Sequence, residues 1–146
     1  MKALITFPER CTSCQICELY CSLKHFNVLS PARSRISVVR RFNTPVVCVQ
    51  CHLCLNSCPH EFVSKDNKTG AVIISEECSG CGTCLNLCPY GAIKIDPTTK
   101  KALVCDLCGG DPECVSRCPE DALAYLDPDK AAYHKRVAFA KLSSRR

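Results

Sequence analysis

The chain has 146 residues, the length of one domain, with a formal net charge of +5, 16 cysteines, no tryptophan and 6% aromatic residues. The hydrophobic fraction of 47% counts those cysteines, so few other apolar side chains remain for a conventional core. Bound inorganic groups are therefore expected to supply part of the interior. No apolar run approaches the roughly 18 residues of a membrane helix, and the apolar stretch before Pro8 is too short for a signal peptide. The lack of a long apolar run thus argues against a membrane span. Dense cysteine is also typical of a secreted disulfide scaffold, but the short N-terminal run and the cysteine spacing described below argue against that class.

The first predicted elements surround a cysteine motif. Lys2 to Phe7 is expected to form a strand that leads into a C-x2-C-x2-C-x3-C motif. Its members are Cys11, Cys14, Cys17 and Cys21. Because Ser22 follows the motif, the chain is expected to continue as a helix through Phe26 and to stop before Ser30-Pro31.

An arginine-rich insertion separates the first motif from the second. Ile36 and Val38 alternate as in a strand, and Thr44-Pro45 is expected to turn the chain. The arginines are Arg33, Arg35, Arg40 and Arg41. They fit a contact to an acidic partner, a positive field at a metal group, or a solvated loop face.

The second and third motifs repeat the spacing of the first, and each is followed by proline. They are Cys48, Cys51, Cys54 and Cys58 before Pro59, and Cys78, Cys81, Cys84 and Cys88 before Pro89. Between them, Ser64 to Gly70 is polar turn material and Ala71 to Ile74 is expected to be a strand. A further strand is expected from Gly91 to Ile95.

The fourth motif carries three extra residues in a loop from Gly109 to Glu113. Its members are Cys105, Cys108, Cys114 and Cys118, followed by Pro119. Strands are expected at 101–104 and 121–126, so a module of roughly thirty residues is used four times. Residues 127–146 form a basic tail that is expected to begin a helix at Asp127-Pro128-Asp129. The tail fits either a docking helix for another subunit or a solvated end.

The spacing indicates iron–sulfur chemistry. Three thiolates two residues apart can hold one cubane on a tight loop, while the fourth thiolate ligates the neighbouring cluster. Zinc sites use paired C-x2-C without a third evenly spaced cysteine. Sixteen cysteines therefore predict four 4Fe-4S clusters. Each oxidised cluster with its thiolates adds roughly −2, which brings the net charge to about −3 and weakens a nucleic-acid interpretation.

The motifs resemble the four-cluster ferredoxin-like electron-transfer subunits, or polyferredoxins, of multisubunit oxidoreductases. The resemblance covers nearly the whole chain, and the run from Val104 to Pro119 carries it most strongly. The Gly109-Gly110-Asp111-Pro112 loop and the short length are most similar to the iron–sulfur partner of tungsten aldehyde oxidoreductase-type enzymes. The resemblance implies an α+β, ferredoxin-like fold of two nested bacterial-type dicluster units with short strands and helices.

The resemblance also implies how the cysteines are shared, with the second motif paired to the third and the first to the fourth. The four ligand sets are set A, Cys11, Cys14, Cys17 and Cys118; set B, Cys105, Cys108, Cys114 and Cys21; set C, Cys48, Cys51, Cys54 and Cys88; and set D, Cys78, Cys81, Cys84 and Cys58. A four-cluster domain is expected at 1–126, with an inner unit at 45–96 and an outer unit formed by 1–30 with 97–126. Serial pairing, first motif with second and third with fourth, stays open from the residues alone.

The expected function is electron transfer without catalysis, because a cluster with four protein thiolates has no open coordination site. The expected partners are a larger catalytic subunit, of the tungsten or molybdenum aldehyde oxidoreductase type, and a soluble ferredoxin or a flavin- or NAD-binding subunit. Alternatives are a free polyferredoxin, whose copies could stack, and the partner of a hydrogenase, a carbon monoxide dehydrogenase or a molybdopterin oxidoreductase. A nucleic-acid-binding iron–sulfur protein is disfavoured. Reduced thiols predict a cytoplasmic, oxygen-poor setting.

Four other side chains lie beside the motifs. His52 and His60 could tune cluster potentials through hydrogen bonds to sulfur, although packing or surface roles are the simpler interpretation. Tyr20 and Tyr90 are expected to shield clusters from water.

Overall fold

The computed structural model describes residues 1–144, without the side chains of residues 138 and 142. Arg145 and Arg146, the last basic residues of the predicted tail, lie outside the described residues. The strands are β1 Ala3–Thr6, β2 Ser37–Val39, β3 Thr44–Val46, β4 Val63–Lys65, β5 Val72–Ile74, β6 Lys94–Ile95, β7 Ala102–Leu103 and β8 Leu123–Leu126. The α-helices are α1 Ile16–Phe26, α2 Thr83–Leu87, α3 Glu113–Arg117 and α4 Pro128–Ser143. Short 3-10 turns cover Pro8–Arg10, Pro31–Arg33, Arg40–Phe42, Leu53–Asn56 and Leu107–Gly110.

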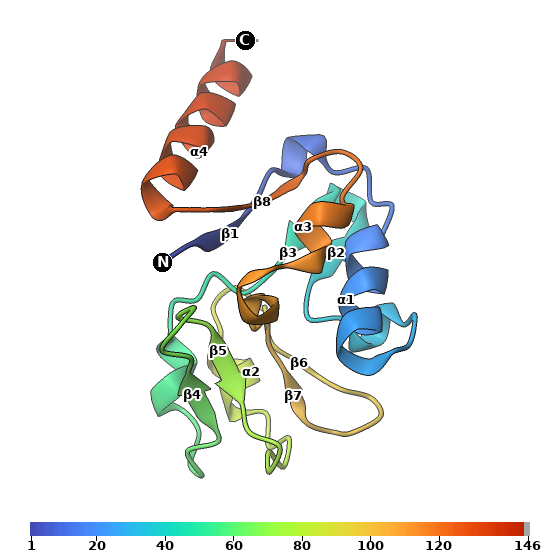
Figure 1. Ribbon diagram of the computed structural model, residues 1–146, viewed down its shortest axis with the longest axis vertical. Coiled ribbons are helices and arrows are strands. Elements are labelled where there is room, and N and C mark those ends of the chain that lie inside the picture. Colours follow the sequence, from blue (N-terminus) through green and yellow to red (C-terminus); the bar gives the residue numbers. More distant parts are fainter. Residues whose placement is uncertain (145–146) are drawn as a thin grey trace.

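The strands pair as four two-stranded antiparallel ladders, β1 with β8, β2 with β3, β4 with β5 and β6 with β7. The first ladder joins the two ends of the chain, with Ala3 opposite Leu126 and Thr6 opposite Leu123. Figure 1 shows β1, β8 and α3 in the upper half of the body, α1 along its right side, and β4, β5 and α2 in the lower half. The mixture of short helices and short antiparallel strands confirms the predicted α+β, ferredoxin-like class.

Two local predictions were wrong. Ser64 and Lys65 were expected in a turn, but they lie in β4 and pair with Ile73 and Val72. Thr44-Pro45 was expected to turn the chain, but both residues lie in β3, with Pro45 opposite Val38. Proline fits there because a two-stranded ladder leaves one edge of each strand unpaired, so its missing N–H need not break a hydrogen bond.

Other elements are shorter than predicted. The strand expected from Gly91 contains only Lys94–Ile95, because Gly91 adopts a positive φ of 61° that turns the chain before the strand begins. The helix through the first motif ends at Phe26 as predicted, where Asn27 adopts a left-handed conformation that closes it.

The interior is built from cysteines together with aliphatic side chains. Seven cysteines belong to the main buried cluster, beside fully buried residues such as Ile36, Val72, Val104 and Leu107. Helix α4 packs on the body through Ala131, which contacts Ile5 and Phe7 of the β1 region. Figure 1 shows the rest of α4 extending away from the molecule. The tail is therefore a helix that docks through its first two turns, where Ala131 and His134 contact the β1 region, and extends away from the body beyond them.

Two arginines of the insertion form ion pairs with aspartates of this same chain. Arg33 donates through Nε and Nη2 to both carboxylate oxygens of Asp96, at 3.0 and 2.9 Å, and Asp96 is fully buried. Arg35 Nη1 lies 2.9 Å from Asp106 Oδ2. Arg40 and Arg41 are on the exposed 3-10 turn. The insertion is thus tied to the loop before β7 through Asp96 and to the fourth motif through Asp106, and two of its four arginines stay exposed.

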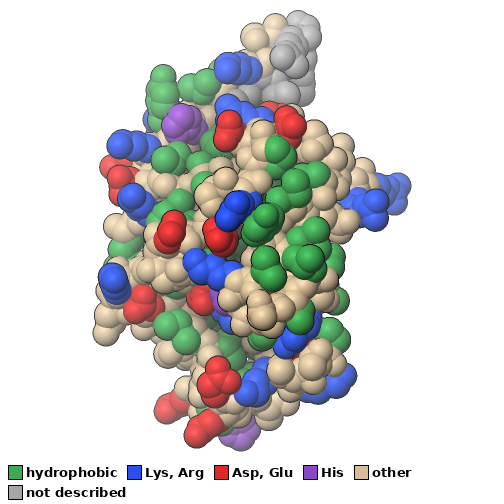
Figure 2. Space-filling model, turned by 45° about the vertical axis from the view of Figure 1, so that its right-hand side comes forward, with side chains coloured by type: hydrophobic (Ala, Val, Ile, Leu, Met, Phe, Trp, Pro, Cys, Tyr) green, Lys and Arg blue, Asp and Glu red, His purple; other side chains and the backbone are tan. Residues whose placement is uncertain are grey.

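The surface carries charges of both signs. On the face drawn in Figure 2, basic and acidic side chains are interspersed. Such mixing gives no broad field of one sign on that face. Among the helices of residues 1–144, none combines the length and apolar character needed to cross a bilayer.

Candidate iron–sulfur sites

The four cysteine motifs share one backbone turn. In each motif, the residue two positions after the first cysteine has a positive φ. These residues are Ser13, Gln50, Gly80 and Leu107, with φ of 59°, 56°, 73° and 56°. Left-handed backbone is unfavourable for residues with a side chain, by about 1–2 kcal/mol, so its recurrence in all four loops indicates a geometry that the loops must adopt. The turn curls each loop so that its first three cysteines can share one site.

Gly80 meets a second constraint. A Cβ placed on this residue would lie 1.8 Å from the backbone carbonyl oxygen of Lys100. The third motif therefore passes directly against the turn that precedes β7, and only glycine allows that approach.

Set A lines one pocket. Cys11, Cys14, Cys17 and Cys118 face it together with apolar side chains that include Val38 and Leu123. Burial raises the pKa of Cys17 to about 12, and the thiolates of Cys14 and Cys118 add to the rise. Cys118 of the fourth motif thus lies among the first three cysteines of the first motif.

Set D lines a second pocket. Cys58, Cys78, Cys81 and Cys84 face it, with His60 and Phe62 on one side. The Thr83 hydroxyl lies 3.4 Å from Cys81 Sγ and lowers the pKa of that exposed thiol. The last cysteine of the second motif thus joins the first three of the third.

Set C shows the reciprocal sharing, because its fourth cysteine comes from the third motif. Burial raises the pKa of Cys48 to about 11, and nearby thiolates of Cys54, Cys51 and Cys88 raise it further. The pKa of Cys54 is raised by burial and also by Cys51 and Cys88. Cys88 of the third motif therefore lies with the second motif.

Set B is the most enclosed. Cys21, Cys105 and Cys114 are buried and Cys108 is half-buried, whereas sets A, C and D each include one exposed cysteine. Burial raises the pKa of Cys114 to about 12, with further contributions from Cys21 and Cys108. Burial likewise raises the pKa of Cys105, and Cys114 and Cys21 add to it. Cys21 of the first motif thus lies within the fourth.

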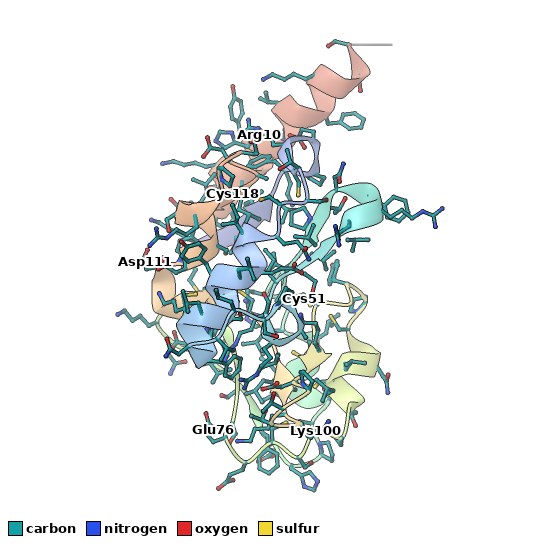
Figure 3. The ribbon with its side chains drawn as sticks, turned by 90° about the vertical axis from the view of Figure 1, so that its right-hand side faces the viewer. Arg10, Cys51, Glu76, Lys100, Asp111 and Cys118 are labelled. Atoms are coloured by element: carbon teal, nitrogen blue, oxygen red, sulfur yellow. The ribbon has the colours of Figure 1, made fainter. Side chains whose placement is uncertain are left out.

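The sets follow one another in the order D, C, B, A. Cys84 of set D is close enough to Cys54 of set C for that thiolate to raise its pKa, beyond the effect of burial. Cys114 of set B is close to Cys17 of set A. Figure 3 places Cys118 toward the α4 end of the molecule, Cys51 nearer the middle, and Glu76 and Lys100 toward the opposite end.

Gln50 joins sets C and B. Its backbone N–H donates to Cys48 Sγ at 3.4 Å, and its side-chain Nε2 donates to the carbonyl oxygen of Cys105 at 2.8 Å. Its Oε1 accepts from the N–H of Val72 at 2.8 Å. One side chain therefore spans the junction between the inner and outer cysteine sets.

Backbone N–H groups point at several sulfurs. Phe62 donates to Cys58 Sγ at 3.4 Å and Ala122 donates to Cys118 Sγ at 3.3 Å, in both cases from four residues further along the chain. Proline after the cysteine, followed by a left-handed residue at Glu61 or Asp121, brings the chain back to the sulfur. Such bonds stabilise a charged sulfur.

The first motif departs from this pattern. Because Ser22 replaces proline, α1 continues past Cys21, and the N–H of Arg35 from the insertion donates to Cys21 Sγ at 3.3 Å. One helical turn beyond Cys21, His25 Nδ1 lies 2.8 Å from the Cys21 carbonyl oxygen and 3.8 Å from its Sγ. His25 Nε2 lies 3.0 Å from Asp106 Oδ1.

These contacts change the local acid–base chemistry. Burial would raise the pKa of Cys21, but hydrogen bonds from His25 and from the Arg35 N–H bring that pKa below its usual value. Burial would lower the pKa of His25, but its bonds to Asp106 and Cys21 raise it to about 9. The pKa of Asp106 falls to about 2, because His25 and Arg35 outweigh the opposing effect of burial.

Sequence reasoning missed this network. His25 lies four residues after Cys21 on a predicted helix, and Asp106 lies between Cys105 and Cys108, so the helical spacing was the available signal. The histidines that were considered have other contacts, with His52 Nε2 2.7 Å from the Gly70 carbonyl oxygen and His60 stacked on Phe62. Tyr20 lies under the Arg117 guanidinium, and Tyr90 is 52% exposed, which makes it a poor shield.

The cysteines fit iron–sulfur clusters. All sixteen are free thiols, and most of those whose pKa is shifted have it raised by burial and by neighbouring thiolates. Four mutually repelling thiolates need a cationic group between them to remain charged, and metal binding supplies one. N–H groups directed at sulfur add to the fit.

Comparison with known proteins identifies the same chemistry. Residues 44–95 match the family model of the 4Fe-4S dicluster domain, and residues 8–24 match that of a 4Fe-4S binding domain. A curated relative from Pyrococcus furiosus, "Aliphatic sulfonate oxidoreductase, polyferredoxin-like subunit", is 47% identical over 79 residues. That match covers 51% of this chain and 45% of the relative, so it spans less than half of the relative's length.

Solved structures share the fold over nearly the whole chain. The active site complex BamBC of benzoyl coenzyme A reductase as isolated is 26% identical, with a TM-score of 0.51, and the match covers 99% of this chain and 90% of that chain. The same complex with zinc gives 25% identity and a TM-score of 0.51, with 99% and 91% covered. Motif spacing, thiol geometry and family matches agree, and the chain contains ferredoxin-type 4Fe-4S binding domains.

Proposed function

We propose that this protein is the electron-transfer subunit of an oxidoreductase complex and carries four 4Fe-4S clusters in series. The observation that carries the proposal is the convergence of the cysteines into four sets. Thiolates of sets D and C, and of sets B and A, are near enough to interact, and Gln50 links sets C and B. A bound 4Fe-4S cluster supplies one-electron oxidation and reduction. The chain's own residues hold, space and shield the four centres.

The proposed ligands are the four sets in full: Cys11, Cys14, Cys17 and Cys118; Cys105, Cys108, Cys114 and Cys21; Cys48, Cys51, Cys54 and Cys88; and Cys78, Cys81, Cys84 and Cys58. The pockets of sets A and D and the thiolate neighbours of sets B and C support this nested sharing over serial pairing. Four thiolates at each centre leave no position for substrate, so the chain is proposed to be non-catalytic.

A partner has an accessible surface near set C. Cys51 is exposed, and apolar side chains beside the set C cysteines are also exposed, with Val49 at 47%, Leu53 at 56% and Leu87 at 50%. Apolar side chains around an accessible redox centre suit contact with another protein, because they exclude water from the path between the two centres. Exposed cysteines in sets A and D, Cys14 and Cys81, supply further exits.

The proposed partner is a larger catalytic subunit of the tungsten or molybdenum aldehyde oxidoreductase type, with a ferredoxin or a flavin- or NAD-linked subunit on the other side. The relative named as a polyferredoxin-like subunit and the structural likeness to BamBC support an oxidoreductase assembly. The proposed setting is the cytoplasm, where thiols stay reduced.

Anaerobic purification from the native cell tests this function, with iron, molybdenum and tungsten measured on the protein and on any companion. About sixteen irons per chain, with tungsten in a larger companion, is the expected result. Sixteen irons without a companion would favour a free polyferredoxin, and a companion that contains neither tungsten nor molybdenum would favour a different oxidoreductase. Zinc, or far fewer irons, would overturn the four-cluster proposal.

A further inference from the structure

Set B occupies an interior place in the series, between sets C and A, and it is the set with no exposed cysteine. Cys21 is 7% exposed, Cys105 8% and Cys114 6%. Burial disfavours the addition of negative charge, so a centre held here would accept an electron less readily than its more exposed neighbours. An interior centre of low potential would obstruct transfer along the series.

The side chain of His25 lies against this set in a defined orientation. Its Nδ1 faces two acceptors of Cys21, the carbonyl oxygen at 2.8 Å and Sγ at 3.8 Å. Its Nε2 faces the carboxylate of Asp106 at 3.0 and 3.2 Å. A carbonyl oxygen and a carboxylate can only accept, so both ring nitrogens donate and the imidazole ring carries a positive charge.

Asp106 fixes this ring in place. The carboxylate receives His25 on one side, Arg35 Nη1 at 2.9 Å on the other, and the N–H of Cys108 at 2.9 Å. The His25 side chain is 11% exposed. Because the ring is anchored at both nitrogens and is shielded from water, its charge acts on Cys21 through a low dielectric.

The charged groups around set B sum to an excess of positive charge. Four cationic side chains face this set: His25, Arg35, Lys24 and Lys94. Lys24 is near enough to interact with Cys108, and Lys94 with Cys21. Asp106 and Glu18 oppose them. Elsewhere among residues 1–144, the hydrogen-bond partners recorded for cysteine sulfurs are backbone N–H groups and the Thr83 hydroxyl. Set B is thus the set with a charged side chain beside a sulfur.

We propose that His25, anchored by Asp106, is a positioning residue that raises the reduction potential of the centre held by set B, and so offsets the effect of burial. The N–H of Arg35 on the same sulfur acts in the same direction. One electron passes from a reduced neighbour to this centre and on to the next, with no bond formed or broken at His25. The proposal deepens the electron-transfer function above and rests on it.

The test is a redox titration of the anaerobically purified, iron-loaded protein, followed by electron paramagnetic resonance. His25→Leu removes the charge and both donors, His25→Gln removes the charge and keeps one donor nitrogen, and His25→Lys keeps a charge. Both neutral variants are expected to lower one of the four reduction potentials by at least about 59 mV. This shift corresponds to a tenfold change in the equilibrium constant for one-electron reduction. The Lys variant is expected to recover part of the shift.

His134→Gln is the matched control, because His134 packs on Phe7 and Tyr133 in the region of α4. All four potentials are expected to stay unchanged in this variant. Unchanged potentials in fully loaded His25→Leu and His25→Gln proteins would overturn the inference, as would an equal shift in the His134 control. Fewer than four reducible centres in the wild-type protein would instead contradict the proposed function.

If neither neutral variant keeps its iron, the wild-type protein labelled with 15N-histidine carries the test. Pulsed paramagnetic resonance is expected to detect one histidine nitrogen coupled to a reduced centre, and His25→Lys protein is expected to lose that signal. Absence of the coupling in wild-type protein would overturn the inference.

Discussion

The proposed inner and outer cysteine units use the same loops but close them in different ways. The inner unit is continuous in sequence, and its β4 and β5 strands form a hairpin in which Val63 lies opposite Ile74. The outer unit joins the two ends of the chain through β1 and β8, and α1 packs on α3. The same ligand chemistry is therefore reached once by local contacts and once by contacts across most of the chain.

The outer unit is held by more contacts than the inner unit, and these contacts join segments that are far apart in the sequence. Its ladder has four residue pairs, against three in the β4–β5 ladder, and His25 and Arg35 both bind Asp106 across the unit. Bringing distant segments together carries a larger loop-closure entropy, which these contacts must offset. We expect the inner unit to keep its structure under milder perturbations than those that open the outer unit.

Iron removal is expected to have the largest effect and to abolish the difference between the units. Isolated two-stranded ladders are marginal in water, and seven of the residues in the buried cluster are cysteines. Hydrogen–deuterium exchange of protein depleted with a chelator should show protection lost in β1 and β8 and in β4 and β5. Protection retained at β1 and β8 in iron-free protein would show that the outer unit does not depend on its clusters.

Asp96→Ala is expected to produce the next largest effect, because it leaves Arg33 without its buried partner. Arg33 is 15% exposed and Asp96 is fully buried, and removing one member of a buried pair typically costs about 3–5 kcal/mol. The urea midpoint of the iron-loaded protein should fall accordingly. Glu76→Ala is the control, since Glu76 is 98% exposed in its pair with Lys101 and should leave the midpoint unchanged. Equal midpoints in both variants would contradict a stabilising role for the Arg33–Asp96 ion pair.

Two glycines of the third motif give a matched pair of substitutions. Gly80 and Gly82 have φ of 73° and 80°, but a Cβ on Gly80 meets the Lys100 carbonyl whereas a Cβ on Gly82 meets nothing within 4 Å. Alanine should cost about 1–2 kcal/mol at either position through the left-handed backbone. Gly80→Ala should cost about 1–3 kcal/mol more through overpacking. Iron content and urea midpoints measure the difference, and equal stability of the two variants would contradict the close approach.

Gln50→Ala tests the junction between the units and should have the smallest effect. It removes the partners of the Val72 N–H and the Cys105 carbonyl, at about 1–3 kcal/mol if both groups stay buried. Gln15→Ala is the control, because Gln15 donates to Glu18 within the same helix region. A larger fall in urea midpoint for Gln50→Ala is expected, and a fall no greater than that of the control would mean that water replaces the lost bonds.

Much of the site could be predicted because it is determined by residues close together in the sequence. The spacing of Cys48, Cys51 and Cys54 places three thiolates on one turn. In the second and fourth motifs, the proline after the last cysteine sets the return of an N–H to its sulfur. The β3 strand was missed because Pro45 usually ends a strand, and only its partner β2 makes the position acceptable.

Contacts between distant segments could not be predicted in the same way. Asp96 follows the strand predicted to end at Ile95, and Asp106 lies within the fourth motif, yet their partners Arg33 and Arg35 come from an insertion more than sixty positions away. Four arginines in a loop give no sign of which two will be buried. The packing of the insertion on the outer unit decides this, and that packing depends on how the cysteine sets are shared.

A crystal structure of the iron-loaded protein, with anomalous scattering measured at the iron edge, tests the nested sharing most directly. It should show four groups of iron sites, with Cys118 bound to the group held by Cys11, Cys14 and Cys17, and with Cys21 bound to the group held by Cys105, Cys108 and Cys114. Cys21 bound to the second motif, or a set of four cysteines without iron, would contradict the account.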